Sequence, residues 1–245
     1  MLVDAGYQHK NGAVFLRSGN TVEFDFRDKL SPGWGTTYQV VRADFDHLLA
    51  REAERQGADV RYEQEILACE FPDGRARVQA RTAAGERLEY EGKFLLDASG
   101  FGRVLPRLLK LDRPSAFPVR RSINTHVADR IADAGYDRNK ILIAVHPDHH
   151  DVWYWLIPFC GGRSSIGVVA RENFFDGLPS DPMTRIKTLI GQEPGLAALL
   201  RHADYDTQVR EITGYSSDVT QLCGPGYALL GNAGEFLDPV FSSGV

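Results

Sequence analysis

Two tryptophans stand one residue apart in DVWYWLIPF, residues 151–159. Because side chains alternate between the two faces of a β-strand, Trp153, Trp155 and Ile157 are expected to project from one face. Pro158 has no N–H group to donate and is expected to end the strand. Two large rings on one face are more often part of a core than the wall of a cofactor site, and the spacing alone leaves both interpretations open.

A single lysine, Lys10, lies in GYQHKNGAVF between a predicted turn and a predicted strand. A lone lysine is usually a solvated surface residue. Its chemistry becomes useful only where a pocket removes it from water, because burial changes the pKa of an ammonium group. Lys10 is therefore a candidate catalytic residue whose role depends on its surroundings.

Two glycine-containing segments follow apolar strands: DASG at residues 97–100 and GNAGEFLDPVFSSGV at residues 231–245. Small residues at the carboxyl end of a strand let a ligand approach the backbone, and free N–H groups there can hold an anion. We expect both segments to border one crevice. The alternative is that each is only a tight turn, and for residues 97–100 taken alone that alternative is favoured.

Histidines and cysteines do not predict a metal site. HPDHHD, residues 146–151, lies at an expected hairpin bend, where adjacent imidazoles seldom converge on one ion. Cys69, Cys160 and Cys223 are odd in number and widely spaced. They indicate reduced thiols in a cytoplasmic protein, and neither a disulfide framework nor a zinc site.

The composition is that of an ordinary globular protein, with 43% hydrophobic and 25% charged residues among 245. Lys and Arg total 28 against 33 Asp and Glu, a net charge of −5. This balance argues against a nucleic-acid partner or an anionic membrane, because both require a basic patch. No apolar run approaches the roughly 20 residues of a membrane-spanning helix, and the N-terminal residues do not resemble a signal peptide.

Strand and helix patterns are mixed along the chain and predict an α/β (α+β mixed) fold with a large, partly antiparallel sheet. Helices are expected over residues 42–57, 104–111, 179–191 and 194–203. The first is predicted to carry an apolar stripe, and Ser180 or Asp181 is expected to cap the third just before Pro182. Strands are expected over residues 13–18, 21–26, 38–41, 58–63, 65–71, 75–81, 93–100, 141–147, 152–159, 164–170 and 227–234.

Four of these segments occur in the same order in the flavin-dependent halogenases, and the chain resembles that family. WYWLIP, residues 153–158, is similar to the W-x-W-x-I-P motif, and GYQHKNGAVF is similar to the stretch that carries the catalytic lysine. DASG resembles the family's D-x-S-G segment, and residues 231–245 resemble its flavin-contacting loop. Each match alone is weak, but together they span residues 6–245.

The resemblance implies the FAD-binding fold of flavin monooxygenases, incomplete here, with a large mixed sheet on the substrate side. It implies three parts. A partial FAD-binding domain with an inserted hairpin covers residues 1–110, the substrate-side sheet and helices cover 111–220, and the return to the FAD-binding domain covers 221–245. The G-x-G-x-x-G turn that holds the FAD pyrophosphate does not occur in the sequence. The chain is therefore expected to be a piece of a halogenase.

The resemblance also implies roles for individual residues. Lys10 would be the catalytic lysine, and the wall between flavin and substrate would consist of Trp153, Trp155, Ile157 and Pro158. The implied cofactor-binding residues are Arg42, Asp97, Gly100, Gly231, Asn232, Asp238 and Pro239, and the implied halide-binding residues are Ser243 and Gly244. Asn232 stands where many relatives have Asp, and its carboxamide can still donate and accept hydrogen bonds.

The implied reaction is the halogenation, chiefly chlorination, of an electron-rich aromatic compound such as a phenol or pyrrole, free or bound to a carrier protein. A flavin reductase would transiently supply reduced FAD, and O2 would allow chloride or bromide to be oxidised to hypohalous acid, which would travel to Lys10. The indoles would keep water and substrate away from the flavin. Phe241 stands where tryptophan halogenases carry a glutamate, which argues against free tryptophan as the substrate. Such enzymes serve secondary metabolism, including antibiotic biosynthesis.

Two other functions stay open. An FAD-dependent monooxygenase or oxidoreductase without halogenase activity could carry the same helix over residues 42–57, and product analysis with and without halide would separate it. A non-catalytic remnant would account for the absence of G-x-G-x-x-G, and a yellow purified protein would argue against it. Lys10 and the W-x-W-x-I-P match favour the halogenase.

Overall fold

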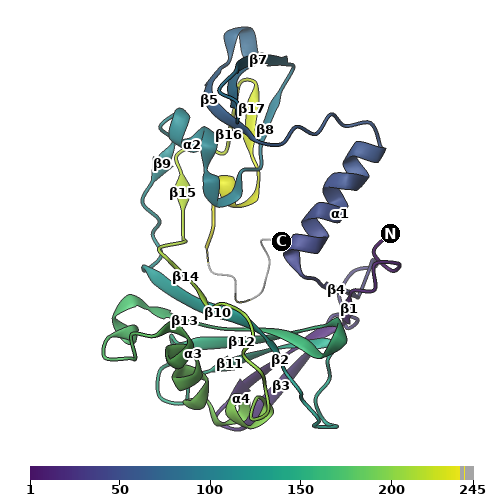
Figure 1. Cartoon of the computed structure of the whole chain (residues 1–245), viewed down its shortest axis with the longest axis vertical. Helices are drawn as coiled ribbons and strands as arrows, with labels where there is room; N and C mark the ends of the chain where they lie inside the picture. Colours follow the sequence, from purple (N-terminus) through teal and green to yellow (C-terminus); the bar gives the residue numbers. More distant parts are fainter. Residues whose placement is uncertain (238–239, 241–245) are drawn as a thin grey trace. The chain divides into compact units, whose positions relative to one another are not determined.

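A computed structural model of the chain describes residues 1–237 and 240, and these form two compact units. Unit 1 comprises Met1–Leu49 and Arg120–Thr213, and unit 2 comprises Ala50–Val119 and Gly214–Val245. Figure 1 labels the elements of each unit. The expected division into flavin-binding and substrate-side parts stays a prediction, because compactness alone does not reveal what either unit binds.

Unit 1 is built on a seven-stranded sheet with the order β14-β10-β13-β12-β11-β2-β3 (Figure 1). β2 and β11 pair in parallel and the other neighbours pair antiparallel, so the predicted mixed sheet is confirmed. The strands are β2 (Gly12–Arg17), β3 (Asn20–Asp25), β10 (Arg120–Ala128), β11 (Lys140–Val145), β12 (Trp153–Phe159), β13 (Arg163–Arg171) and β14 (Arg210–Thr213).

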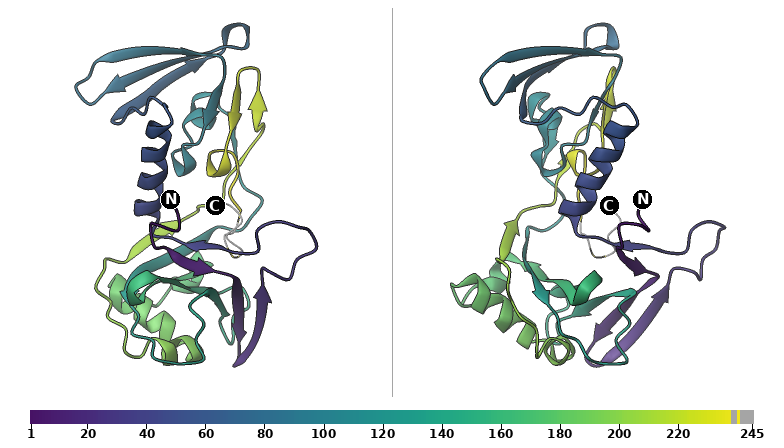
Figure 2. Two further views of the ribbon diagram at one scale, coloured as in Figure 1. Left: turned by 90° about the vertical axis from the view of Figure 1, so that its right-hand side faces the viewer. Right: turned by 45° about the vertical axis from the view of Figure 1, so that its right-hand side comes forward.

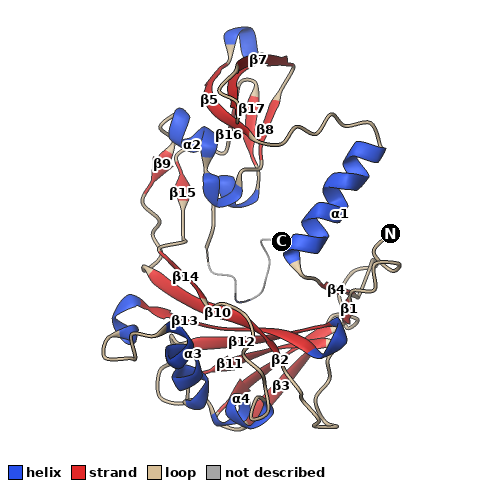
Figure 3. Ribbon diagram, viewed as in Figure 1, coloured by secondary structure: helices blue, strands red, loops and turns tan. Residues whose placement is uncertain are grey.

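Two helices cover one face of this sheet, α3 (Pro182–Gly191) and α4 (Pro194–Leu199), drawn in blue beside the red strands in Figure 3. α3 begins as predicted, because the Asp181 carboxylate accepts a hydrogen bond from the Thr184 N–H group. The helices bury Ile186, Leu189 and Leu196 against the sheet in one core. Each such side chain stabilises the fold by about 1.5–3 kcal/mol through its removal from water.

The remaining elements of unit 1 are short. β1 (Gln8–Lys10) and β4 (Thr37–Gln39) form a two-stranded antiparallel ladder. Figure 2 shows the long loop that joins β3 to β4. α1 (Arg42–Arg55) begins in unit 1 and ends in unit 2, and none of its residues is buried despite the predicted apolar stripe.

Unit 2 contains two three-stranded sheets, with the orders β5-β6-β7 and β16-β17-β8. Leu105, Val219, Tyr227 and Leu229 form its core. Its elements are β5 (Gln64–Glu70), β6 (Ala76–Thr82), β7 (Arg87–Gly92), β8 (Leu95–Asp97), α2 (Val104–Leu108), β9 (Asp112–Arg113), β15 (Asp218–Val219), β16 (Cys223–Gly224) and β17 (Tyr227–Leu229). Short 3-10 turns lie at Pro72–Gly74, Gly100–Gly102 and Gly231–Ala233 in this unit, and at Cys160–Gly162 and Glu172–Phe175 in unit 1.

Three expectations about strands were wrong. Residues 58–63 form no strand, and β5 begins only after Glu63, whose φ of 57° is left-handed. Pro158 does not end β12, because it pairs with Ser164 of β13 and the strand continues to Phe159. The pairing of β12 with β11 reaches only Leu156, so the missing N–H of Pro158 removes no ladder hydrogen bond on that side.

The third error is the expected strand over residues 227–234, which ends at Leu229 and passes into the turn Gly231–Ala233. In addition, seven strands were not predicted: β1, β7, β9, β10, β14, β15 and β16. Among the described residues, no helix is both long and apolar enough to cross a bilayer.

Candidate active site

The tryptophan pair lies on β12, between β11 and β13. Tyr154 and Leu156 are fully buried in the core with α3 and α4, so Trp153 and Trp155 project from the opposite face, as predicted from strand alternation. The two ring centroids are 5.9 Å apart and the ring planes meet at 46°. The two indoles therefore lie side by side on the face of the sheet away from the helices.

Gly167 fixes the orientation of one indole. It stands opposite Trp155 in the register of β12 and β13, and a Cβ atom at this position would overlap the indole ring. The Trp155 Nε1–H group donates to the Ser165 hydroxyl at 3.0 Å. The ring is therefore held across β13 by one hydrogen bond and by the absence of a side chain at Gly167.

Trp153 is only 7% exposed, and its buried Nε1–H group has no hydrogen-bond partner in the part of the chain that the structure describes. An unpartnered buried donor costs about 1–3 kcal/mol. This donor belongs to a side chain on the face away from α3 and α4.

Lys10 is partly buried at the end of β1, where it pairs with Thr37 of β4. Its Nζ atom lies 5.5 Å from the centroid of the Phe26 ring, a cation–π contact. Among the described residues, no carboxylate pairs with its ammonium group. Burial lowers the pKa of the Lys10 ammonium. The structure thus gives Lys10 the desolvated surroundings that a catalytic role requires.

Polar contacts fix the ladder that carries Lys10 against the large sheet. The Gln8 carboxamide donates to Asn139 at 3.1 Å, and the Gln39 carboxamide donates to the Arg138 carbonyl at 2.9 Å. Cys160, directly after β12, donates its thiol to the Gly6 carbonyl. Lys10 and the Pro158 end of β12 therefore belong to the same end of the sheet.

Arg42, expected to approach the flavin, is the first residue of α1 and is 63% exposed in its side chain. Its guanidinium pairs with Asp46 of the same helix at 2.9 Å. A surface pair of this kind contributes about 0–1 kcal/mol, so the guanidinium can exchange this carboxylate for another anion at little cost.

In unit 2 the two glycine-containing segments come together. β8 and β17 are parallel neighbours, with Asp97 in register with Leu229, and the Leu230 N–H group donates to the Asp97 carbonyl at 2.8 Å. The segments that follow, residues 98–102 and 231–234, thus leave the same edge of one sheet. That the two segments border one crevice stays a prediction.

Asp97 itself holds the first of these segments in shape. Its carboxylate accepts hydrogen bonds from the Ser99 N–H group at 2.7 Å and from the Leu105 N–H group at 2.8 Å. The residue is 7% exposed. Both oxygens are therefore used inside the protein, and any effect of Asp97 on a cofactor acts through the position of the loop.

The second segment offers open backbone and a free carboxamide. Gly100 and Gly231 have φ angles of 58° and 52°, and no other group lies within 4 Å of a Cβ atom built on either. The partly buried Asn232 side chain makes no hydrogen bond within the described ranges. These features fit the ring and polyol side of a flavin, which needs close backbone approach and hydrogen-bonding groups. Asp238, Pro239, Phe241, Ser243 and Gly244 lie outside the described residues.

Arg103 holds this edge of unit 2 together, and the sequence interpretation missed it. Its guanidinium donates to the carbonyls of Asn232, Ala233 and Gly234 at 3.1–3.3 Å, and it pairs with the Asp112 carboxylate. The residue is only 8% exposed. It therefore clamps the loop that carries Asn232. The sequence did contain an indication of this role. A positive charge at the start of a helix is electrostatically unfavourable, so an arginine just before the predicted helix over residues 104–111 suggests that its guanidinium has a partner elsewhere.

The histidines of residues 146–151 build a turn. The Nδ1 atom of buried His146 accepts hydrogen bonds from the N–H groups of Asp148 and His149, and the two imidazole centroids are 4.8 Å apart. Burial lowers the pKa of His146. Its ring is therefore a structural part of the bend between β11 and β12.

Comparison with known proteins points to one family. Residues 18–245 match the family model described as tryptophan halogenase. The chain is 27% identical to sulochrin halogenase gedL of Aspergillus terreus, over 98% of the chain and 48% of that protein. It is also 27% identical to the 1H-pyrrole-2-carbonyl-(peptidyl-carrier protein) chlorinase of Pseudomonas fluorescens, over 99% of the chain and 55% of that protein.

Among solved structures, the chain is similar to a flavoprotein/dehydrogenase from Cytophaga hutchinsonii. The TM-score is 0.93 and the identity 39%, over 99% of this chain and 59% of that one. The chain thus spans about half the length of the two curated relatives.

Proposed function

The chain belongs to the tryptophan halogenase family of flavin-dependent enzymes, and from this premise we propose that it serves in the FADH2- and O2-dependent halogenation of an electron-rich aromatic compound. The observation that carries the proposal is the environment of Lys10. A partly buried lysine that has a lowered pKa and rests on an aromatic ring is suited to hold a small oxidant by hydrogen bonding.

In this proposal the Lys10 ammonium donates a hydrogen bond to hypohalous acid and positions its halogen toward the substrate ring. A positioned proton donor of this kind contributes roughly 10²- to 10⁴-fold to a rate. Because the ammonium has no carboxylate partner among the described residues, its donors stay available to the oxidant.

Trp153, Trp155, Ile157 and Pro158 are proposed to form the wall between flavin and substrate. Trp153 and Trp155 lie on the face of β12 opposite the helices, and the Gly167 contact holds one of them in a fixed orientation. A rigid aromatic wall excludes water, which protects a reactive oxidant from side reactions.

The proposed flavin contacts lie on the edge where β8 and β17 end. Asn232 would hydrogen-bond the polyol chain, and Gly100 and Gly231 would allow close backbone approach. When bound, reduced FAD supplies the electrons that activate O2. Further proposed contacts are Arg42, Asp97, Asp238 and Pro239 for FAD, and Ser243 and Gly244 for chloride or bromide. The sequence has no counterpart of the pyrophosphate-binding G-x-G-x-x-G turn, so these residues account for only one side of the cofactor.

The proposed substrate is a phenol or a pyrrole, free or attached to a carrier protein. The similarity to a pyrrole chlorinase that acts on a carrier-bound substrate supports the second form. A flavin reductase is the proposed transient partner. A cytoplasmic location agrees with the free state of Cys69, Cys160 and Cys223.

A second candidate is an FAD-dependent monooxygenase or oxidoreductase that does not halogenate. The 39% identity to a protein described as a flavoprotein/dehydrogenase favours it. Under this alternative the same wall residues of β12 would line the site of a substrate that is hydroxylated or oxidised. The products distinguish the two functions.

The test supplies the protein with a flavin reductase, FAD, O2 and bromide or chloride, and analyses phenol and pyrrole products by mass spectrometry. We expect a halogenated product that disappears with Lys10→Ala, a loss of at least about 10²-fold, while O2 consumption continues. Lys187→Ala is the matched control, because Lys187 also rests on an aromatic ring but is exposed on α3. Halogenation by the Lys10 variant would exclude the proposed role of this lysine, and hydroxylated products alone would favour the second candidate.

A further inference from the structure

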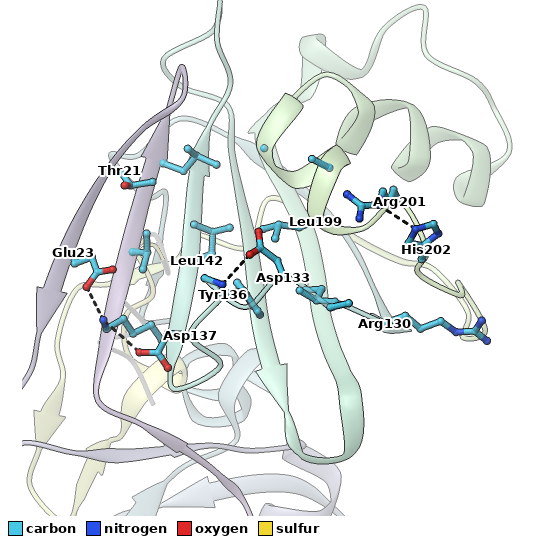
Figure 4. A pocket seen from close by; sticks show the side chains of 18 residues that line it. Thr21, Glu23, Arg130, Asp133, Tyr136, Asp137, Leu142, Leu199, Arg201 and His202 are labelled. Carbon is cyan, nitrogen blue, oxygen red and sulfur yellow. Dashed lines mark hydrogen bonds and ion pairs between the residues drawn. The ribbon is translucent and has the colours of Figure 1, made fainter.

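A cavity of about 420 Å³ opens on the face of the large sheet that carries α3 and α4 (Figure 4). Its floor consists of Val14 and Leu16 of β2 and Leu142 of β11. Leu16 and Leu142 belong to the same core as Tyr154 and Leu156. The cavity therefore lies on the opposite side of the sheet from the tryptophan pair and is separate from the proposed halogenation site.

The walls of the cavity are largely apolar. Ile131 and Tyr136 come from the connection between β10 and β11, and Ala198 and Leu199 come from α4. α4 rests directly on β2 at one end, since a Cβ atom at Gly195 would lie 2.6 Å from Leu16 Cδ2. This contact sets the spacing between α4 and β2 at that end of the cavity, so α4 cannot move closer to β2 there.

Charges at the rim are balanced. The acidic residues that line the cavity are Glu23, Asp133 and Asp137, and the basic residues are Arg130, Lys140 and Arg201. Lys140 Nζ already pairs with Glu23 at 2.6 Å and with Asp137 at 3.4 Å. Figure 4 shows Glu23 and Asp137 on one side of the cavity and Arg201 on the other. A charged ligand would gain little, because the rim has no net charge and its strongest pairs would have to separate.

The size of the cavity is that of a ligand site. The volume of about 420 Å³ falls within the roughly 300–1,000 Å³ typical of small-molecule pockets. We propose that this cavity binds a neutral, mainly apolar ring compound, with its polar substituent at the charged rim.

The experiment uses 2-naphthol as the probe, a neutral fused ring with one hydroxyl group. Its binding to the protein is measured by isothermal titration calorimetry beside 2-naphthoate and 2-naphthylmethylammonium, which carry opposite charges on the same ring. We expect a dissociation constant on the order of 100 µM for 2-naphthol and binding at least about tenfold weaker for both charged compounds. Absent or charge-independent binding would overturn the proposal.

Two variants locate the binding. Ala198→Trp fills the cavity from an exposed position on α4, so the core is left intact, and it should weaken 2-naphthol binding at least about tenfold. Thr188→Trp places the same side chain at an exposed position of α3 outside the cavity and should bind as the parent does. Equal binding by the two variants would refute this site.

Amide chemical shifts give a measurement that does not depend on variants. In ¹H–¹⁵N spectra, 2-naphthol should perturb residues 131–142 and 195–202, and saturable shifts confined to β12 residues would instead place the probe at the tryptophan face. These spectra are recorded without flavin reductase, FAD or halide, so the shifts do not depend on turnover at the proposed halogenation site. Failure of halogenation and failure of this proposal are therefore distinguishable.

Discussion

At the scale of single residues, Lys10 gains its chemical character from what surrounds it. The contact with Phe26 stabilises the charged form, whereas burial destabilises it and lowers the pKa. Without a carboxylate partner among the described residues, the burial effect dominates. Retaining a charged group in such a position lowers the stability of the fold, which is typical of a residue kept for function.

Replacing Lys10 by Met should therefore stabilise the protein near pH 7, by about 0.5–2 kcal/mol. The lowered pKa in the folded state means that the unfolded chain binds more protons between the folded pKa and the ordinary value of 10.5. The stability of the parent rises with pH across that window, so the advantage of the variant should shrink as the pH rises through the folded pKa of Lys10. Urea unfolding near pH 7 and pH 10 measures both effects. Lys187→Met is the exposed control, and an advantage independent of pH would contradict the argument.

At the scale of elements, the edge formed by β8 and β17 depends on one guanidinium. Arg103 satisfies carbonyls in the Gly231–Ala233 turn and at Gly234, and it also donates to the Asp218 carbonyl at 3.0 Å. Removing the Arg103 side chain would therefore leave all of these carbonyl oxygens without this donor at once. The shape of the proposed flavin-contacting loop is thus set from α2, which begins directly after Arg103.

Arg103→Ala should cost about 3–5 kcal/mol, because it leaves the Asp112 carboxylate and several carbonyls without their partner. Amide hydrogen exchange of residues 231–236 should accelerate more than that of β5 and β6. The control is Arg113→Ala, which removes a 54% exposed guanidinium from Asp218 and should cost only about 0–1 kcal/mol. Equal effects of the two variants would show that Arg103 does not clamp the loop.

At the scale of the whole molecule, the described residues form two units with separate cores. One core surrounds Tyr154 and Leu156, and the other surrounds Leu105 and Leu229. The chain passes between the units within α1, at residues 49 and 50, and again at residues 119–120 and 213–214. Because the hydrophobic cores are separate, we expect each unit to unfold locally without the other.

Leu105→Ala should lower local stability in unit 2 by about 2–5 kcal/mol, because Leu105 is 1% exposed. Hydrogen exchange should accelerate in β8, α2 and β17, whereas β12 and β13 should stay protected. Leu156→Ala should give the converse pattern. If either variant accelerated exchange in both units equally, the two units would form one cooperative structure.

The sequence predicted the elements whose pattern is local. The hairpin β2–β3, the antiparallel run β11–β12–β13, and the helices α1, α3 and α4 follow from alternation, periodicity and caps such as Asp181. β10 was missed although Ile123, Thr125 and Val127 are buried at alternate positions. Ile123 and Val127 are its only large apolar residues, so the strand signal in the sequence is weak. The strand expected over residues 58–63 failed at the left-handed Glu63, which no propensity indicates.

The site was predictable only in part, for a related reason. Motifs placed Lys10, the tryptophans and the glycine segments, but their partners lie far along the chain. Phe26 follows Lys10 only after an intervening hairpin, and Arg103 reaches carbonyls more than a hundred residues away. Such contacts depend on how strands are ordered in a sheet, and spacing in the sequence does not encode that order.

The contact between Trp155 and Gly167 means that substitutions at these two positions should be correlated in evolution. A lineage that gained a side chain at Gly167 would lose the place where the indole lies, and a lineage that lost the indole would release the glycine from its constraint. Change at these two positions must therefore occur in a set order, with the tryptophan replaced first. Descendants that retain the aromatic wall should retain the glycine, and those that have replaced Gly167 should also have lost the ring at Trp155.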